Sequence, residues 1–111
     1  MNVYDTVNKL AQELKTSDEY VNLKKYKELI NNNSEVKDKI KKFQTLRYDI
    51  QIGAMQGVEP DKEKEKELQE LYAELLSKEN VKEYFDAEFK FNILLADVNK
   101  IIGEAVQDVL E

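Results

Sequence analysis

The side chains with the chemistry to act as catalysts or metal ligands are nearly all carboxylates. Glu67, Glu70 and Glu74 follow one another at helical spacings of three and four residues, so they would share a helix face. Such pairs can serve as general acid and base or as ligands of hard cations. The sequence has no histidine and no cysteine, which removes the commonest general base and most transition-metal ligands. We therefore expect no enzyme, no metal site and no cofactor.

Other catalytic and nucleotide-binding motifs are also missing from the sequence. The three glycines, Gly53, Gly57 and Gly103, are scattered and form no phosphate-binding loop. A Ser-His-Asp arrangement is impossible without histidine. These absences favour a protein that acts by binding other macromolecules.

The best candidate for a nucleic-acid contact is a set of lysines in the first half of the chain. Residues 1–60 hold 10 Lys/Arg against 9 Asp/Glu, whereas residues 61–111 hold 7 against 14, within a net charge of −6. Glu28, Glu35 and Asp38 interleave with these lysines, so we interpret them as solvated surface, with a direct RNA-binding face as the alternative. The lysines of this set are Lys24, Lys25, Lys27, Lys37, Lys39, Lys41 and Lys42.

The apolar periodicity predicts an all-α protein, an open bundle of about five helices forming a single domain over residues 1–111. The expected helices cover residues 3–14, a segment from a Thr16–Glu19 capping box to about Ile30, residues 34–56, a segment from Asp61 to Leu76, and a long helix from Asn80 to about Leu110. Ser34 and Asn80 are expected N-caps. Gly57 should end the third helix, and Gly57-Val58-Glu59-Pro60 should connect it to the fourth as an antiparallel hairpin.

The last of these helices carries an unusually wide apolar arc. Surface helices of monomers show an apolar stripe a little over 100° wide, and here the arc spans more than half the circumference, with Leu95 near its centre. We expect Leu95 to be buried. Either the helix is central and covered by its own neighbours, or part of the arc is a subunit interface. The candidate interface residues on this helix and the first one are Val3, Val7, Leu10, Phe85, Phe89, Phe91, Leu94, Val98 and Ile101.

Three polar residues, Glu88, Asn92 and Asn99, fall inside the same arc. Arg47 is similarly placed in the apolar stripe of the third helix, between Phe43 and Ile50. Because an unpaired charge inside an apolar surface is costly, we expect Arg47 to pair with Glu88. Asn92 and Asn99 would complete a structural polar network that fixes register; a ligand pocket is the alternative.

An ordered set of short motifs resembles the YlbF/YmcA family of bacterial regulatory proteins, most closely its YheA-like branch. The motifs are Val3-Tyr4-Asp5, Ser17-Asp18-Glu19-Tyr20, Leu23-Lys24, Met55-Gln56-Gly57-Val58-Glu59, and Leu95-Ala96-Asp97-Val98-Asn99-Lys100-Ile101-Ile102. The resemblance covers nearly the whole chain. Some members of the wider family hold an iron–sulfur cluster through cysteines, and this sequence has none, so that chemistry does not carry over.

The resemblance implies a protein of a low-GC Gram-positive bacterium that forms homodimers or larger oligomers. It implies a regulatory adaptor that binds proteins, as an accessory factor in RNA processing or in the control of competence, sporulation and biofilm formation. The first residues lack the basic and apolar regions of a signal peptide, and no apolar run approaches the roughly 20 residues that span a bilayer. We therefore expect a cytoplasmic protein without a membrane partner.

Overall fold

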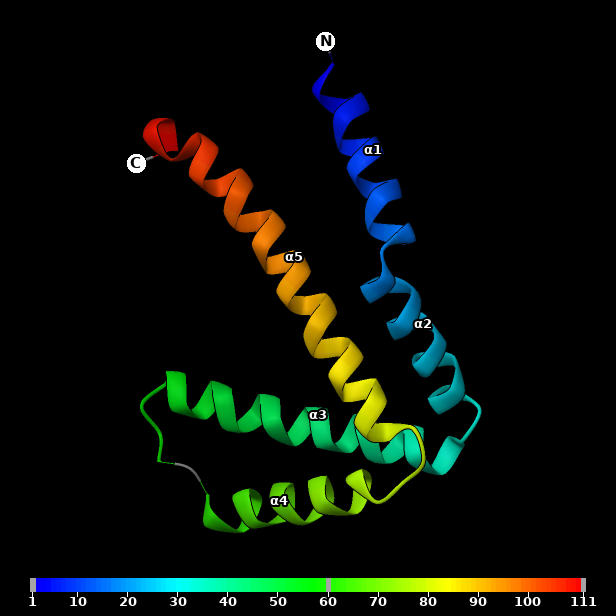
Figure 1. Ribbon diagram of the computed structural model, residues 1–111. Coiled ribbons are helices and arrows are strands. Elements are labelled where there is room, and N and C mark those ends of the chain that lie inside the picture. Colours follow the sequence, from blue (N-terminus) through cyan, green and yellow to red (C-terminus); the bar gives the residue numbers. More distant parts are fainter. Residues whose placement is uncertain (1, 60, 111) are drawn as a thin grey trace. The chain divides into compact units, whose positions relative to one another are not determined.

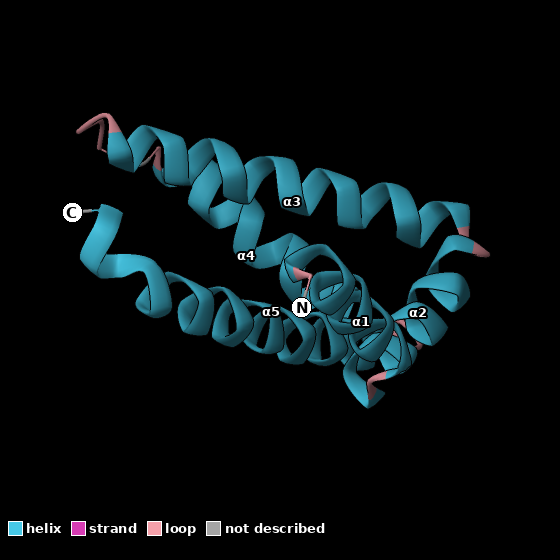
Figure 2. Ribbon diagram, turned by 90° about the horizontal axis from the view of Figure 1, so that it is seen from above, coloured by secondary structure: helices cyan, strands magenta, loops and turns pink. Residues whose placement is uncertain are grey.

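The computed structural model describes residues 2–59 and 61–110, and these form five helices and no strand. The helices are α1 (Val3–Thr16), α2 (Asp18–Asn31), α3 (Ser34–Met55), α4 (Lys62–Leu76) and α5 (Val81–Leu110) (Figure 1; Figure 2). The predicted fold class and the long C-terminal helix are confirmed. In the predicted connection between α3 and α4, Pro60 lies outside the described residues.

The helix boundaries follow local capping chemistry. The Asn2 side chain accepts from the Tyr4 N–H at 2.8 Å, and the Asp61 side chain accepts from the Glu63 N–H at 2.9 Å. At the end of α3, Gly57 has φ 75°, and Val58 N–H donates to the Gly53 carbonyl at 2.9 Å. This is a Schellman arrangement, so the predicted stop at Gly57 is confirmed.

Two predicted N-caps are wrong by one residue. The hydroxyl that caps α2 belongs to Ser17, which accepts from the Tyr20 N–H at 3.2 Å, while Thr16 donates back to the Gln12 carbonyl at 3.1 Å. The cap of α3 is Asn33, which accepts from Val36 N–H at 3.2 Å, rather than Ser34. In both places two residues with good capping side chains are adjacent, and the turn geometry selects one of them.

The residue before α5 is Asn80, as predicted, but its backbone is unusual. Its φ is 68°, the left-handed region that asparagine tolerates better than most residues. This backbone conformation lies outside the extended region of an ordinary N-cap, and the predicted capping role of the Asn80 side chain stays a prediction.

The chain forms two compact units. Unit 1 contains α1, residues 18–26 of α2 and residues 83–110 of α5; unit 2 contains the described residues between 27 and 82. Within unit 2, α3 and α4 pack side by side as the predicted hairpin (Figure 1). The buried apolar side chains of this unit are Ile30, Val36, Ile40, Phe43, Leu71, Leu75 and Val81. Unit 2 therefore holds most of the buried apolar side chains of the described residues.

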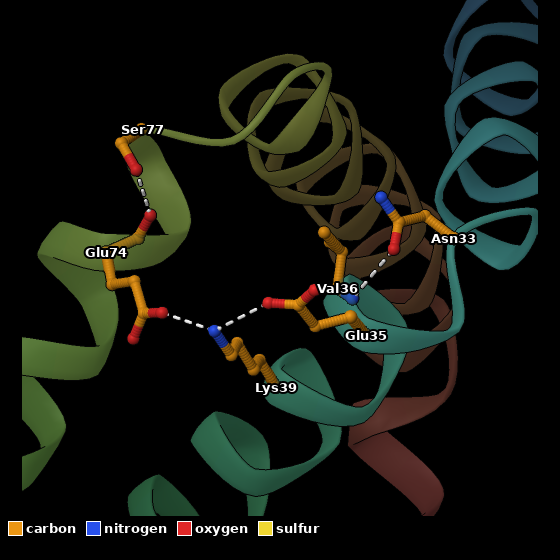
Figure 3. Close-up of polar contacts among 6 residues, drawn as sticks. All are labelled: Asn33, Glu35, Val36, Lys39, Glu74 and Ser77. Atoms are coloured by element: carbon orange, nitrogen blue, oxygen red, sulfur yellow. Dashed lines mark hydrogen bonds and ion pairs between the residues drawn. The ribbon is translucent and has the colours of Figure 1, made fainter.

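The hairpin of unit 2 is also joined by ion pairs. Lys39 of α3 donates to Glu35 of the same helix at 3.1 Å and to Glu74 of α4 (Figure 3). A second pair joins Lys42 to Glu67 at 3.0 Å. The hydrogen bond from Lys39 lowers the pKa of both Glu74 and Glu35, and the hydrogen bond to Glu74 raises the pKa of Lys39.

These pKa shifts predict how the hairpin responds to pH. Glu35 and Glu74 contribute to the stability of the hairpin above the ordinary pKa of a glutamate, and this contribution is lost as pH falls through their lowered pKa values. The contribution of Lys39 is lost as pH rises through its raised pKa. We expect Lys39→Met to lower the melting temperature slightly at neutral pH and low salt. The difference from the native protein should be constant between about pH 5 and pH 10 and shrink outside that range.

The matched control is Lys66→Met, since Lys66 is more exposed and makes only a 4.0 Å pair with Glu70 within α4. Thermal melts followed by circular dichroism should show a smaller difference for this variant. A pH-independent loss in Lys39→Met would mean that its alkyl chain, rather than its charge, stabilises the hairpin.

Candidate protein interface

The candidate interface residues all lie in unit 1, and the chain leaves several of them uncovered. The exposed fraction is 73% for Val3, 52% for Val7, 64% for Phe89 and 68% for Ile101. Leu10, Phe85, Phe91, Leu94 and Val98 are half-buried. Side chains of this kind in contact with water are typical of a binding surface.

The first half of α5 is the part that unit 1 covers. Tyr84 and Ala87 are buried, and the Tyr20 ring of α2 meets the Phe91 ring edge-on, with 5.9 Å between centroids. Beyond this contact the second half of α5 extends away from α1 and α2, as both views show (Figure 1; Figure 2). The cover provided by α2 therefore ends near the middle of α5.

From Leu95 to Leu110, only Val98 is even half-buried. Exposure reaches 51% at Ile102, 77% at Val109 and 78% at Leu110. Leu95 itself is 37% exposed, so the single chain does not bury it as expected of a core leucine. The wide arc on α5 is thus an exposed surface, and the reading in which its own neighbours cover the helix fails for its second half.

The exposed surface also includes the first helix. Val3, Val7, Leu10 and Leu14 repeat at spacings of four and three along α1, which aligns them on one face. Tyr4, beside them, is 79% exposed. We call the exposed apolar residues of α1 and α5 the unit-1 apolar face. Its members are Val3, Tyr4, Val7, Phe89, Ile93, Leu95, Ile101, Ile102, Val106, Val109 and Leu110.

Two residues of the predicted polar network make contacts of another kind, and the other two are exposed. Glu88 is half-buried and accepts a hydrogen bond from the Tyr84 hydroxyl at 3.1 Å. The Arg47 guanidinium, in unit 2, lies over the Phe43 ring at 5.6 Å. Asn92 and Asn99 are exposed on α5. The sequence pattern did not indicate the cation–π contact, and the pairing of Arg47 with Glu88 stays a prediction.

A groove in unit 1 brings carboxylates together. It has a volume of about 390 Å³ between α2 and α5 and is lined by Asp18, Glu19, Asn22, Tyr26, Glu83, Asp86, Ala87 and Lys90. Lys90 pairs with Asp86 at 3.1 Å. In the part of the chain that the structure describes, no group of three or more acidic side chains is arranged to hold a metal ion.

The lysines of the alternative RNA face divide between the units. Lys24 and Lys25 belong to unit 1 and the others to unit 2. Lys39 and Lys42 are engaged by carboxylates, and Lys25 lies over the Tyr26 ring at 5.1 Å. Lys24, Lys27, Lys37 and Lys41 are exposed, and within residues 2–59 and 61–110 none of these four makes an ion pair.

The described helices include none long and apolar enough to cross a membrane.

Comparison with known proteins places the sequence among bacterial relatives. A family model described as "Control of competence regulator ComK, YlbF/YmcA" matches residues 3–107. A UPF0342 protein of Desulfitobacterium hafniense is 37% identical, over 99% of this chain and 89% of the relative. UPF0342 proteins of Limosilactobacillus reuteri (32% identical, 98% and 89% covered) and Halothermothrix orenii (36% identical, 92% and 86% covered) are also similar.

Proposed function

The chain belongs to this family of competence-control proteins, and on that premise we propose that it is a non-enzymatic regulatory adaptor of the cytoplasm. In this proposal it acts by binding proteins through the unit-1 apolar face. The observation that carries the proposal is the exposure of that face along α1 and the second half of α5. A monomer that worked alone would gain nothing from keeping so much apolar surface in water.

Self-association is the first interaction that we propose, as a homodimer or larger symmetric oligomer. Burying an apolar side chain removes about 60–120 Å² from water, so the eleven members of the unit-1 apolar face together offer about 600 Å² at their observed exposure. Since roughly 60% of an interface is apolar, this corresponds to about 1,000 Å² per partner. Stable interfaces bury about 800 Å² per partner, so the face is large enough for one.

The further partners that we propose are other regulatory proteins of the family or an RNA-processing complex. The family description names control of a competence regulator, which supports a regulatory role. The resemblance to the YheA-like branch supports an accessory role in RNA processing or in developmental control. We also propose that the two units act as one domain, because the family model spans both of them.

Direct RNA binding is the competing hypothesis. The four exposed lysines that make no ion pair within the described part of the chain favour it, but they belong to a chain of net charge −6, and phosphate binding requires a basic footprint. Ion pairs inside the hairpin already occupy Lys39 and Lys42. Protein binding is therefore the better-supported function.

A pull-down with matched variants separates the two hypotheses. We expect the tagged protein to recover the same proteins from host extract before and after nuclease treatment. Recovery should persist in the charge reversal of Lys24, Lys27, Lys37 and Lys41 to glutamate. It should be lost in Phe89→Asp, because Phe89 is 64% exposed and its replacement places a charge on the apolar face without removing a core side chain.

The RNA arm uses fluorescence anisotropy with labelled single-stranded RNA at two salt concentrations. We expect no binding tighter than about 100 µM, the weak end of non-specific affinities. Tighter binding that weakens with salt and disappears in the lysine variant, together with nuclease-sensitive recovery, would contradict the adaptor proposal.

A further inference from the structure

The exposed half of α5 carries a regular seam. Phe91, Leu95, Val98, Ile102, Ala105 and Val109 follow one another at alternating spacings of four and three residues. Apolar residues at this spacing form the buried seam when two helices pack along their length. Over these residues α5 is about 27 Å long. Among the described residues, the chain partly covers this seam at Phe91, through the Tyr20 ring, and at Val98, which is half-buried.

We propose that this seam pairs antiparallel with α5 of a second copy, about a two-fold axis near Asn99 and Lys100. The inference rests on the self-association proposed above and deepens it by naming the element, its direction and its register. A two-fold axis makes the same patch face itself, so the seam must be self-complementary in shape. The order of its side-chain sizes favours the antiparallel direction.

The antiparallel direction follows from the order of large and small residues. The seam begins with the bulky Phe91 and Leu95 and has its small residue, Ala105, near the other end. Antiparallel pairing sets Leu95 against Ala105 of the partner subunit, and Val98 against Ile102 of the partner subunit. Parallel pairing would set Ala105 against Ala105 of the partner subunit and leave a void that close-packed interfaces avoid.

One polar residue of the arc, Asn99, fits the same register. Asn99 flanks the seam close to the proposed axis and is exposed in the single chain. In the antiparallel pair it would face Asn99 of the partner subunit. A carboxamide is both donor and acceptor, so two symmetry-related asparagines can hydrogen-bond reciprocally. A single polar residue in an apolar seam specifies register.

The charged side of α5 stays in water in this arrangement. Asp97, Lys100 and Glu104 lie on the side opposite the seam, where Lys100 and Glu104 form a 4.0 Å pair. Pairing therefore buries none of these charges. The exposed seam residues Leu95, Ile102 and Val109 supply part of the interface area estimated above.

Single-cysteine cross-linking tests direction and register, because the chain has no native cysteine. The four variants are Leu95→Cys, Asn99→Cys, Lys100→Cys and Ala105→Cys, all at exposed positions, with circular dichroism to verify helix content. A short bismaleimide joins thiols, and a mass tag on one variant distinguishes mixed from identical pairs.

We expect Asn99→Cys to cross-link with itself, and Leu95→Cys to cross-link with Ala105→Cys in a mixture. Leu95→Cys alone and Ala105→Cys alone should react at least about tenfold more slowly, because ten residues of offset separate each identical pair by about 15 Å. Lys100→Cys is the matched control. It lies at the height of the axis but on the opposite side of the helix, so it should not cross-link.

Self-cross-linking of both Leu95→Cys and Ala105→Cys would overturn the antiparallel direction. If the protein has the molar mass of a dimer but none of the seam variants cross-links, the α5 pairing is overturned. The chain would then self-associate through another face. A monomeric mass for the native protein would overturn both. Recovery of other proteins in the nuclease-treated pull-down would still support the adaptor function, so the two failures can be told apart.

Discussion

Replacing Leu75 by alanine should lower the free energy of unfolding by about 2–5 kcal/mol, the range for fully buried leucines. Leu75 lies in α4 with an exposed fraction of 0%, in unit 2, where most of the buried side chains lie. Removing its terminal carbons costs the transfer free energy and also leaves a cavity. Because domains of this size are stable by about 5–15 kcal/mol, the loss is a large share of the total.

The adjacent Leu76 offers a matched control, since it is the same residue type in the same helix but is 39% exposed. Leu76→Ala should cost less than about 1 kcal/mol. Urea unfolding followed by circular dichroism measures both, at one protein concentration because the proposed association would contribute to stability. Equal losses at the two positions would show that α4 does not bury the face that contains Leu75.

Replacing Ile102 by aspartate should dissociate the protein into chains of 13.0 kDa. Ile102 is 51% exposed in the single chain, so the substitution removes little of the chain's own packing and should leave the helix content unchanged. In the proposed assembly the carboxylate would be buried without a partner. We expect the dissociation constant to rise by about 100-fold or more, which is about 3 kcal/mol.

The control for this variant is Gln107→Asp, which adds the same charge to the same helix on the side away from the seam. Sedimentation velocity at matched concentrations should show an unchanged assembly for Gln107→Asp and monomers for Ile102→Asp. If both variants keep the native mass, the seam of α5 is not part of the interface.

The sequence predicts all five helices because each has a regular apolar spacing and a recognisable start or stop. Gly57 ends α3 as expected, since its φ of 75° favours a residue without a side chain. The two wrongly predicted N-caps lie where adjacent residues both have side chains that can cap the helix. Thr16 and Ser17 can both cap α2, and Asn33 and Ser34 can both cap α3, so only the folded turn decides between them.

The division into two units could not be predicted from the pattern. The boundaries fall within α2 and α5, where the apolar spacing continues without a break. Contacts between residues far apart in the sequence also cannot be predicted from the helical periodicity. The stack of Phe43 on Tyr72, with centroids 5.5 Å apart, and the contact of Tyr20 with Phe91 join residues that are distant in sequence.

The sequence indicates where the candidate interface lies, but it does not show whether the same chain or a second copy covers it. The helical periodicity predicts an excess of apolar residues around α5. This excess is compatible with a helix covered by its own chain and with a subunit interface. Leu95 shows why the pattern could not decide. An apolar residue at the centre of an arc is expected to be buried, yet whether its own chain or a second copy buries it depends on tertiary structure, which leaves Leu95 37% exposed.

The most direct test of binding through the unit-1 apolar face is the molar mass of the native protein in solution. Light scattering across a dilution series at micromolar concentrations should give at least twice the 13.0 kDa chain mass. At the lowest concentrations the mass should fall in the manner of a reversible assembly. A constant 13.0 kDa at every concentration would contradict self-association through α1 and α5.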